Sequence, residues 1–112
     1  MYERIVVLIT AGNTEEAQKI AHALVDERLA ACVNVIPAVH SVYRWAGKVE
    51  EDQEALLIVK SRREMLARLI ERVHDLHSYE VPEIIALPLV AGDAPYLRWL
   101  DEQVGPEEQG RD

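Results

Sequence analysis

The 112-residue sequence predicts an α/β (α+β) domain with elements in the order β-α-β-β-α-β and a short C-terminal helix after them. Three observations predict it. β-branched runs indicate strands, apolar stripes of 3.6-residue period indicate two helices between them, and Gly or Pro turn signals separate the elements. The order is that of a ferredoxin-like sandwich, in which right-handed crossovers place both main helices on one face of a four-stranded antiparallel sheet.

The N-terminal part of the chain predicts a buried strand followed by a capped helix. Residues 4–10 form a β-branched run that ends at a Gly-Asn turn signal. Asn13 suits the cap of the next helix, and Glu16 three residues later completes an arrangement like a capping box. Apolar residues then recur at helical spacing as far as Leu24, which gives this helix one apolar stripe.

A long central hairpin is predicted from the next two strands. Residues 30–36 form a strand pattern that is interrupted at Pro37, where we expect a bulge or an edge position because proline cannot donate to a ladder. The pattern resumes over residues 40–45, turns at Gly47, and returns as a third strand over residues 48–60.

A second helix, a fourth strand and a short last helix complete the predicted domain. Ser61 and Glu64 have the spacing of a capping box at the start of the second helix, and Pro82 bars its continuation. Residues 84–90 predict the fourth strand. Asp93 is placed to cap the last helix.

The composition indicates a soluble globular chain. Apolar residues make up 49% of it, and the apolar run at residues 5–9 is too short for a signal peptide or a membrane span, so we expect a cytoplasmic protein. We expect one domain over residues 1–104 and a flexible tail over residues 105–112. Twenty acidic and twelve basic residues give a net charge of −8, which disfavours nucleic acid as a partner and favours cations.

The predicted sheet has more apolar surface than its two helices can cover. The first strand is apolar on both faces, with Val7 and Ile9 on one and Val6 and Leu8 on the other. If the second face of the sheet were exposed to solvent, the apolar patch on it would be larger than monomers normally carry. Self-association by sheet-to-sheet packing is therefore predicted, and cover by the short last helix is the alternative.

Three kinds of side chain suggest binding chemistry, and none forms a catalytic pattern. His74 and His77 have metal-ligand spacing near the end of the second helix, although histidines there also complement the helix dipole. Cys32 is the only cysteine, and its apolar neighbours favour a buried thiol over a nucleophile. Three further residues lie at the ends of predicted elements, where functional residues are common, namely Lys60, Tyr79 and Glu80. No P-loop, dinucleotide fingerprint or serine elbow occurs in the sequence, so no enzyme is predicted.

Three stretches of the chain resemble the CutA divalent-cation tolerance family, namely residues 27–37 (ERLAACVNVIP), 43–52 (YRWAGKVEED) and 76–88 (LHSYEVPEIIALP). The resemblance runs from about Arg4 to Leu100. It implies a ferredoxin-like subunit in a tight homotrimer, similar to the PII signalling proteins, with the long hairpin reaching a neighbour. It also implies a role without catalysis in tolerance of divalent metals, copper in particular.

The resemblance also implies metal ligands. Some bacterial relatives have copper assigned to a first-strand cysteine and to two adjacent histidines, and these positions are here Ile9 and Leu76-His77, so only His77 is kept. One imidazole does not make a tight Cu(II) site. Either His74, Glu80 or a neighbouring subunit completes the ligands of Cu(II) or another divalent cation, or the copper site of the relatives is absent from this chain.

Two hypotheses follow from the family resemblance. The first is a trimeric metal-binding module, with His77 as the main ligand and Cys32 as a candidate for a soft metal. The second is a PII-like regulatory protein that binds a small anionic metabolite in the inter-subunit cleft, where Lys60 holds the charge and Tyr79 and Glu80 line the cleft.

Overall fold

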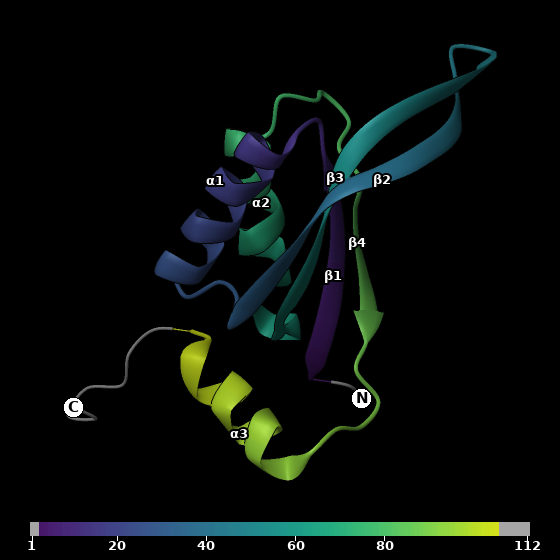
Figure 1. Ribbon diagram of the computed structural model, residues 1–112. Coiled ribbons are helices and arrows are strands. Elements are labelled where there is room, and N and C mark those ends of the chain that lie inside the picture. Colours follow the sequence, from purple (N-terminus) through teal and green to yellow (C-terminus); the bar gives the residue numbers. More distant parts are fainter. Residues whose placement is uncertain (1–2, 106–112) are drawn as a thin grey trace.

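The computed structural model describes residues 3–105, which form a four-stranded sheet with helices packed against one face (Figure 1). The strand order is β2-β3-β1-β4 and every neighbouring pair is antiparallel, which confirms the predicted ferredoxin-like topology. The elements in chain order are β1 (Arg4–Ala11), α1 (Thr14–Asp26), β2 (Cys32–Trp45), β3 (Lys48–Arg62), the 3-10 turn η1 (Arg63–Met65), α2 (Leu66–Leu76), β4 (Ile84–Pro88) and α3 (Ala94–Gln103).

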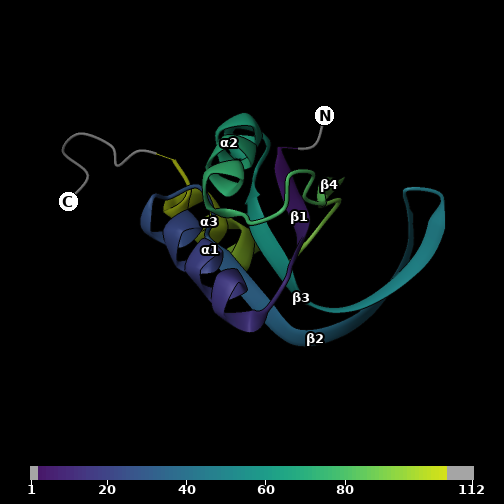
Figure 2. The same ribbon diagram turned by 90° about the horizontal axis from the view of Figure 1, so that it is seen from above.

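The core lies between the sheet and α1 and α2, which lie side by side on one face (Figure 2). Alternate residues of the central strands β1 and β3 point to this face and are buried, as the period of two in a strand requires. The apolar stripes of the helices meet them. The fully buried members are Val7, Ile9, Ala11, Ala17, Ile20, Leu24, Ala55, Leu57, Val59, Leu69 and Val73, together with Leu100 of α3.

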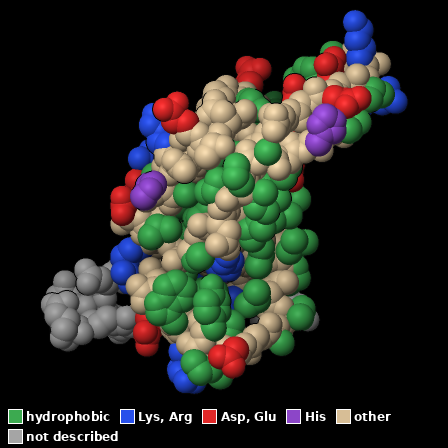
Figure 3. Space-filling view, viewed as in Figure 1, with side chains coloured by type: hydrophobic (Ala, Val, Ile, Leu, Met, Phe, Trp, Pro, Cys, Tyr) green, Lys and Arg blue, Asp and Glu red, His purple; other side chains and the backbone are tan. Residues whose placement is uncertain are grey.

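The opposite face of the sheet carries an apolar patch that α1 and α2 leave uncovered. Val6 and Leu8 of β1 alternate with the buried residues and pair with Leu87 and Ile85 of β4. Ile85 is 50% exposed and Leu87 is 48% exposed. Figure 3 shows apolar side chains gathered where Figure 1 places β1 and β4. The short helix α3 lies across one end of the domain, so it does not cover this patch (Figure 1).

The long hairpin of β2 and β3 is confirmed, and it projects well beyond the body of the domain (Figures 1 and 2). A register shift falls between Ile36 and Val39, on either side of Pro37, as the missing proline donor predicts. The hairpin turns at Ala46 and Gly47, which have φ angles of 53° and 81°. Two successive positive φ angles match the twist of the strands in a two-residue hairpin turn.

The helix caps agree with the sequence at α1 and disagree at α2. The Asn13 side chain accepts a hydrogen bond from the Glu16 backbone N–H at 2.8 Å, so the α1 cap is confirmed. The predicted Ser61–Glu64 capping box is wrong, because pairing with β1 continues to the end of β3 and keeps Ser61 in the strand. Ser61 is buried there, and its hydroxyl donates to the Leu29 carbonyl at 2.6 Å. Asp93 occupies the N-cap of α3 without a side-chain capping bond.

Among residues 3–105, no helix is long and apolar enough to cross a membrane. The predicted tail lies outside the described residues from 106 onward, so the tail and the domain boundary at residue 104 stay predictions. Gly105 forms two hydrogen bonds with Arg28. Its N–H donates to the Arg28 carbonyl at 2.9 Å, and its carbonyl accepts from Arg28 Nε at 2.6 Å.

Candidate functional site

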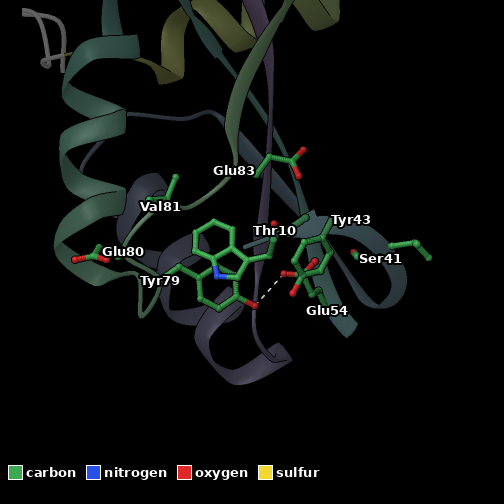
Figure 4. Close-up of a pocket in the computed structure, with 10 residues that line it drawn as sticks. Thr10, Ser41, Tyr43, Glu54, Tyr79, Glu80, Val81 and Glu83 are labelled. Atoms are coloured by element: carbon green, nitrogen blue, oxygen red, sulfur yellow. Dashed lines mark hydrogen bonds between the residues drawn. The ribbon is translucent and has the colours of Figure 1, made fainter. Parts of the chain in front are cut away.

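A pocket of about 620 Å³ opens where the inner side of the hairpin faces the loop that follows α2 (Figure 4). Thr10, near the end of β1, is one of the residues that line it. The other lining side chains come from the hairpin and from the loop between α2 and β4. They include three aromatic rings (Tyr43, Trp45 and Tyr79) and three carboxylates (Glu54, Glu80 and Glu83).

A hydrogen bond between the loop and the hairpin lies at the centre of this pocket. The Tyr79 hydroxyl donates to Oε2 of Glu54 at 2.9 Å, and the dashed line in Figure 4 marks this contact. Glu54 is only 9% exposed, which is unusual for a carboxylate. Burial, and then the hydrogen bond to Glu54, raise the pKa of Tyr79 well above its usual range.

A second phenol donates to a carboxylate on the hairpin itself. Tyr43 of β2 lies opposite Glu50 of β3, and its hydroxyl reaches diagonally to Asp52 on the same face. This hydrogen bond raises the pKa of Tyr43 to about 12. Both phenols therefore remain neutral near pH 7, and the negative charge of the pocket comes from carboxylates alone.

His77 fixes the loop to the end of β1. The His77 side chain is buried, and its ring packs against Tyr79 with centroids 4.7 Å apart. Its Nε2 lies 2.6 Å from the Thr10 carbonyl, and its Nδ1 lies 3.0 Å from the Tyr79 backbone nitrogen. Because the backbone N–H is a donor, Nδ1 accepts this hydrogen bond, and Nε2 is the ring nitrogen that donates to the Thr10 carbonyl.

The predicted pair of histidines does not share a helical face. α2 ends at Leu76, and His77 has the extended angles φ −86° and ψ 140°, whereas His74 is exposed on the last turn of the helix. The carboxylate closest to His77 is instead Glu16 of α1, with Oε2 3.4 Å from Nδ1. Glu16 also accepts hydrogen bonds from the backbone N–H and the hydroxyl of Ser78.

The remaining predicted site residues are divided between two ends of the sheet. Tyr79 and Glu80 line the pocket, although the Glu80 carboxylate points away from the Tyr79–Glu54 pair in Figure 4. Lys60 pairs with Cys32 across the β2–β3 ladder and donates to the Asn34 side chain. It lies six residues along β3 from Glu54, which is roughly 20 Å at strand spacing.

The structure thus joins Tyr79 and Glu80 in one pocket but does not bring Lys60 to them, nor Cys32 to His77. Within the described part of the chain, no group of three or more His, Cys, Asp or Glu side chains is arranged to hold a metal ion. The assignments to copper and to a small ligand therefore stay predictions.

Sequence reasoning missed Glu54 and Trp45 as pocket residues. The acidic run that contains Glu54 is typical of a solvated surface, and the hairpin aromatics are typical of a subunit contact. The signal was the period of two along paired strands, which places Tyr43, Trp45, Asp52 and Glu54 on one face of the hairpin.

Comparisons with known proteins agree on one family. A family model described as CutA1 divalent ion tolerance protein matches residues 5–103. The divalent-cation tolerance protein CutA of Thermus thermophilus is 56% identical over 100 residues, which cover 89% of this chain and 97% of that protein. A solved structure of the divalent cation tolerance protein Cut A1 from the same species has a TM-score of 0.89 at 55% identity and covers 91% of this chain and 99% of that one.

A plant relative is longer than this chain. The chloroplastic protein CutA of Arabidopsis thaliana is 51% identical over 96 residues, which are 86% of this chain and 53% of that protein. The chain therefore spans nearly all of the bacterial relative and about half of the plant one.

Proposed function

Because this chain belongs to the CutA1 divalent ion tolerance family, we propose that it serves divalent-cation tolerance as a non-catalytic homotrimer that binds Cu(II) or another divalent cation. The family match over residues 5–103 supports the tolerance role. The Thermus relative carries the name of a tolerance protein and not that of an enzyme, in keeping with a binding role.

The uncovered sheet face is the observation that carries the proposed assembly. Ile85 and Leu87 are half exposed beside Val6 and Leu8, so the patch is continuous across β1 and β4. Burying a side chain of this size stabilises an assembly by roughly 1.5–3 kcal/mol when the burial is complete. We propose that the same sheet face of another copy packs against this patch. The family resemblance implies that the assembly is a trimer and that the hairpin reaches the neighbouring subunit.

His77 is the proposed main copper ligand, with Glu16 as its neighbour in the site. The 3.4 Å separation between His77 Nδ1 and Glu16 Oε2 already places a nitrogen and an oxygen donor side by side, and Cu(II) accepts both. Coordination at Nδ1 requires the Tyr79 N–H to give up its hydrogen bond. Under this proposal His74, Glu80 or a neighbouring copy completes the ligands, and Cys32 is a separate candidate for a soft metal.

The net charge of −8 supports the capture of cations by the assembly. A trimer carries three times this charge, and a field of that sign raises the local concentration of cations. A PII-like regulator of anionic metabolites is not proposed, because the one lysine assigned to the anion is bonded to Asn34 far from the pocket. A cytoplasmic location belongs to the proposal and is supported by the single cysteine; the Arabidopsis relative is named chloroplastic.

Native mass spectrometry with and without a small excess of Cu(II) tests both parts of this proposal. We expect a trimer that takes up three ions. Ile85→Lys places a charge in the sheet face and should dissociate the trimer, whereas Val25→Lys on exposed α1 should leave it intact. A monomeric wild-type protein contradicts the assembly.

The copper ligands are tested with paired variants. His77→Ala and Glu16→Gln should each lower the number of bound copper ions, and His40→Ala should not, because His40 lies on the exposed hairpin beside Glu51. A trimer that shows only a spread of weak adducts, or that keeps three ions in both variants, contradicts the assignment to His77.

A further inference from the structure

Arg28 follows α1 with a left-handed backbone, a conformation that glycine usually supplies, and its φ angle is 60°. The Arg28 N–H donates to the Val25 carbonyl at 3.1 Å. The Leu29 N–H donates to the Leu24 carbonyl at 2.9 Å. These two bonds form a Schellman motif, in which the left-handed residue is most often glycine because a Cβ atom is disfavoured there. An arginine at this position therefore requires a reason beyond closing α1.

The Arg28 side chain supplies that reason at the end of α3. Its Nη2 donates to the Glu102 carbonyl at 2.7 Å, and its Nε donates to the Gly105 carbonyl at 2.6 Å. The last carbonyls of a helix lack intrahelical partners and carry partial negative charge, and α3 has no basic residue in its own last turn. Arg28 thus caps α3 from a position 74 residues before Glu102 in the chain.

α3 depends on such bonds because it buries little apolar surface. Its ten residues are all described, and Leu100 alone among them is buried, whereas α1 buries three. Tyr96 and Trp99 are 43% and 40% exposed. The helix also lies across one end of the domain, apart from the layer of α1 and α2 (Figure 1). Segments with few buried apolar contacts open at a lower free energy than the core of a protein.

We propose that Arg28 is a latch between α1 and α3, and that residues 94–105 form a terminal flap that opens as one unit when the Arg28 bonds break. The sheet, α1 and α2 stay folded in the open form, because their core is built from their own buried side chains. The glycine usual at this position would close α1 equally well but has no side chain to hold α3. This inference goes beyond the proposed metal function and does not depend on it.

Hydrogen–deuterium exchange of the intact protein, followed by mass spectrometry, tests the latch. In the wild type, we expect the amides of the flap to exchange faster than those of α1 and α2. Arg28→Gly should speed exchange in the flap at least about tenfold, the factor that corresponds to one charge-assisted hydrogen bond. Exchange in α1 should change less than about twofold, because glycine completes the Schellman motif. Arg28→Lys keeps the charge but loses the fork of donors, so it should also speed exchange in the flap.

The matched control is Arg72→Ala, which removes an arginine bonded to Glu27 beside the end of α1 and should alter exchange in the flap less than about twofold. Unchanged flap exchange in Arg28→Gly or in Arg28→Lys overturns the latch. Equal acceleration of the whole domain in Arg28→Gly overturns the local opening, and so does a wild-type flap that exchanges no faster than α1 and α2. Native mass spectra of Arg28→Gly should show unchanged assembly and copper uptake, which separates this test from that of the metal function.

Discussion

Asp101 of α3 accepts two hydrogen bonds from the Arg4 guanidinium of β1, at 3.0 and 2.7 Å, across 97 positions of the chain. The same carboxylate lies 2.6 Å from the guanidinium of Arg62, at the end of β3. One side chain thus ties the last helix to two neighbouring strands of the sheet. Bidentate Arg–carboxylate pairs of this kind are the stronger class of ion pair.

We expect Asp101→Asn to lower the free energy of unfolding by about 1 kcal/mol, since an amide cannot accept charge-assisted bonds from both arginines and the pair is partly solvated. The measurement is urea denaturation followed by circular dichroism. Glu102→Gln, at the next position on α3, is the matched control and should change stability far less. Equal effects of the two variants would show that Asp101 acts only through net charge.

The same carboxylate predicts a pH dependence. The hydrogen bond from Arg4, together with the Arg62 contact, holds the pKa of Asp101 below its ordinary value of 3.8. A carboxyl whose pKa is depressed in the folded state stabilises the protein fully above its unfolded pKa, and this contribution is lost as the pH falls through the folded pKa. The stability difference between wild type and Asp101→Asn should therefore be constant near neutrality and shrink below about pH 4. A difference that persists at about pH 2 would contradict this linkage.

His77 should matter for stability far more than His74. His77→Ala leaves the buried Thr10 carbonyl and Tyr79 N–H without partners, which costs about 1–3 kcal/mol. His74→Ala, on the exposed face of α2, should change stability by less than about 0.5 kcal/mol. Denaturation midpoints of the two variants, taken without metal, decide the question; similar midpoints would mean that the His77 bridge contributes little.

Much of the fold was predictable because it depends on local patterns. The β-branched run of β1, the Asn13 cap and the interruption at Pro37 act through backbone propensity and neighbouring residues, and the structure confirms all three. The start of α2 was not predictable in this way. Ser61 has the spacing of a cap, but pairing with β1 keeps it in β3, and a contact between distant segments overrides the local signal.

The candidate site was less accessible, because its parts come from distant positions. Tyr79 and Glu80 were identified by their place at an element end, whereas Glu54 belongs to an acidic run with no local sign of burial. Tyr79 meets Glu54 across 25 positions of the chain, and the two side chains form a hydrogen bond only in the folded structure.

The sequence by itself determined the order of strands and helices, the two-faced apolar strands, the acidic charge and the family to which the chain belongs. These properties depend on residue type and spacing along the chain. Only the tertiary structure decided that α2 stops before His77, that both nitrogens of His77 are occupied, and that Glu54 lies buried beneath Tyr79. Burial and hydrogen-bond partners are properties of segments that meet in space, and no local pattern in a sequence encodes which segments meet.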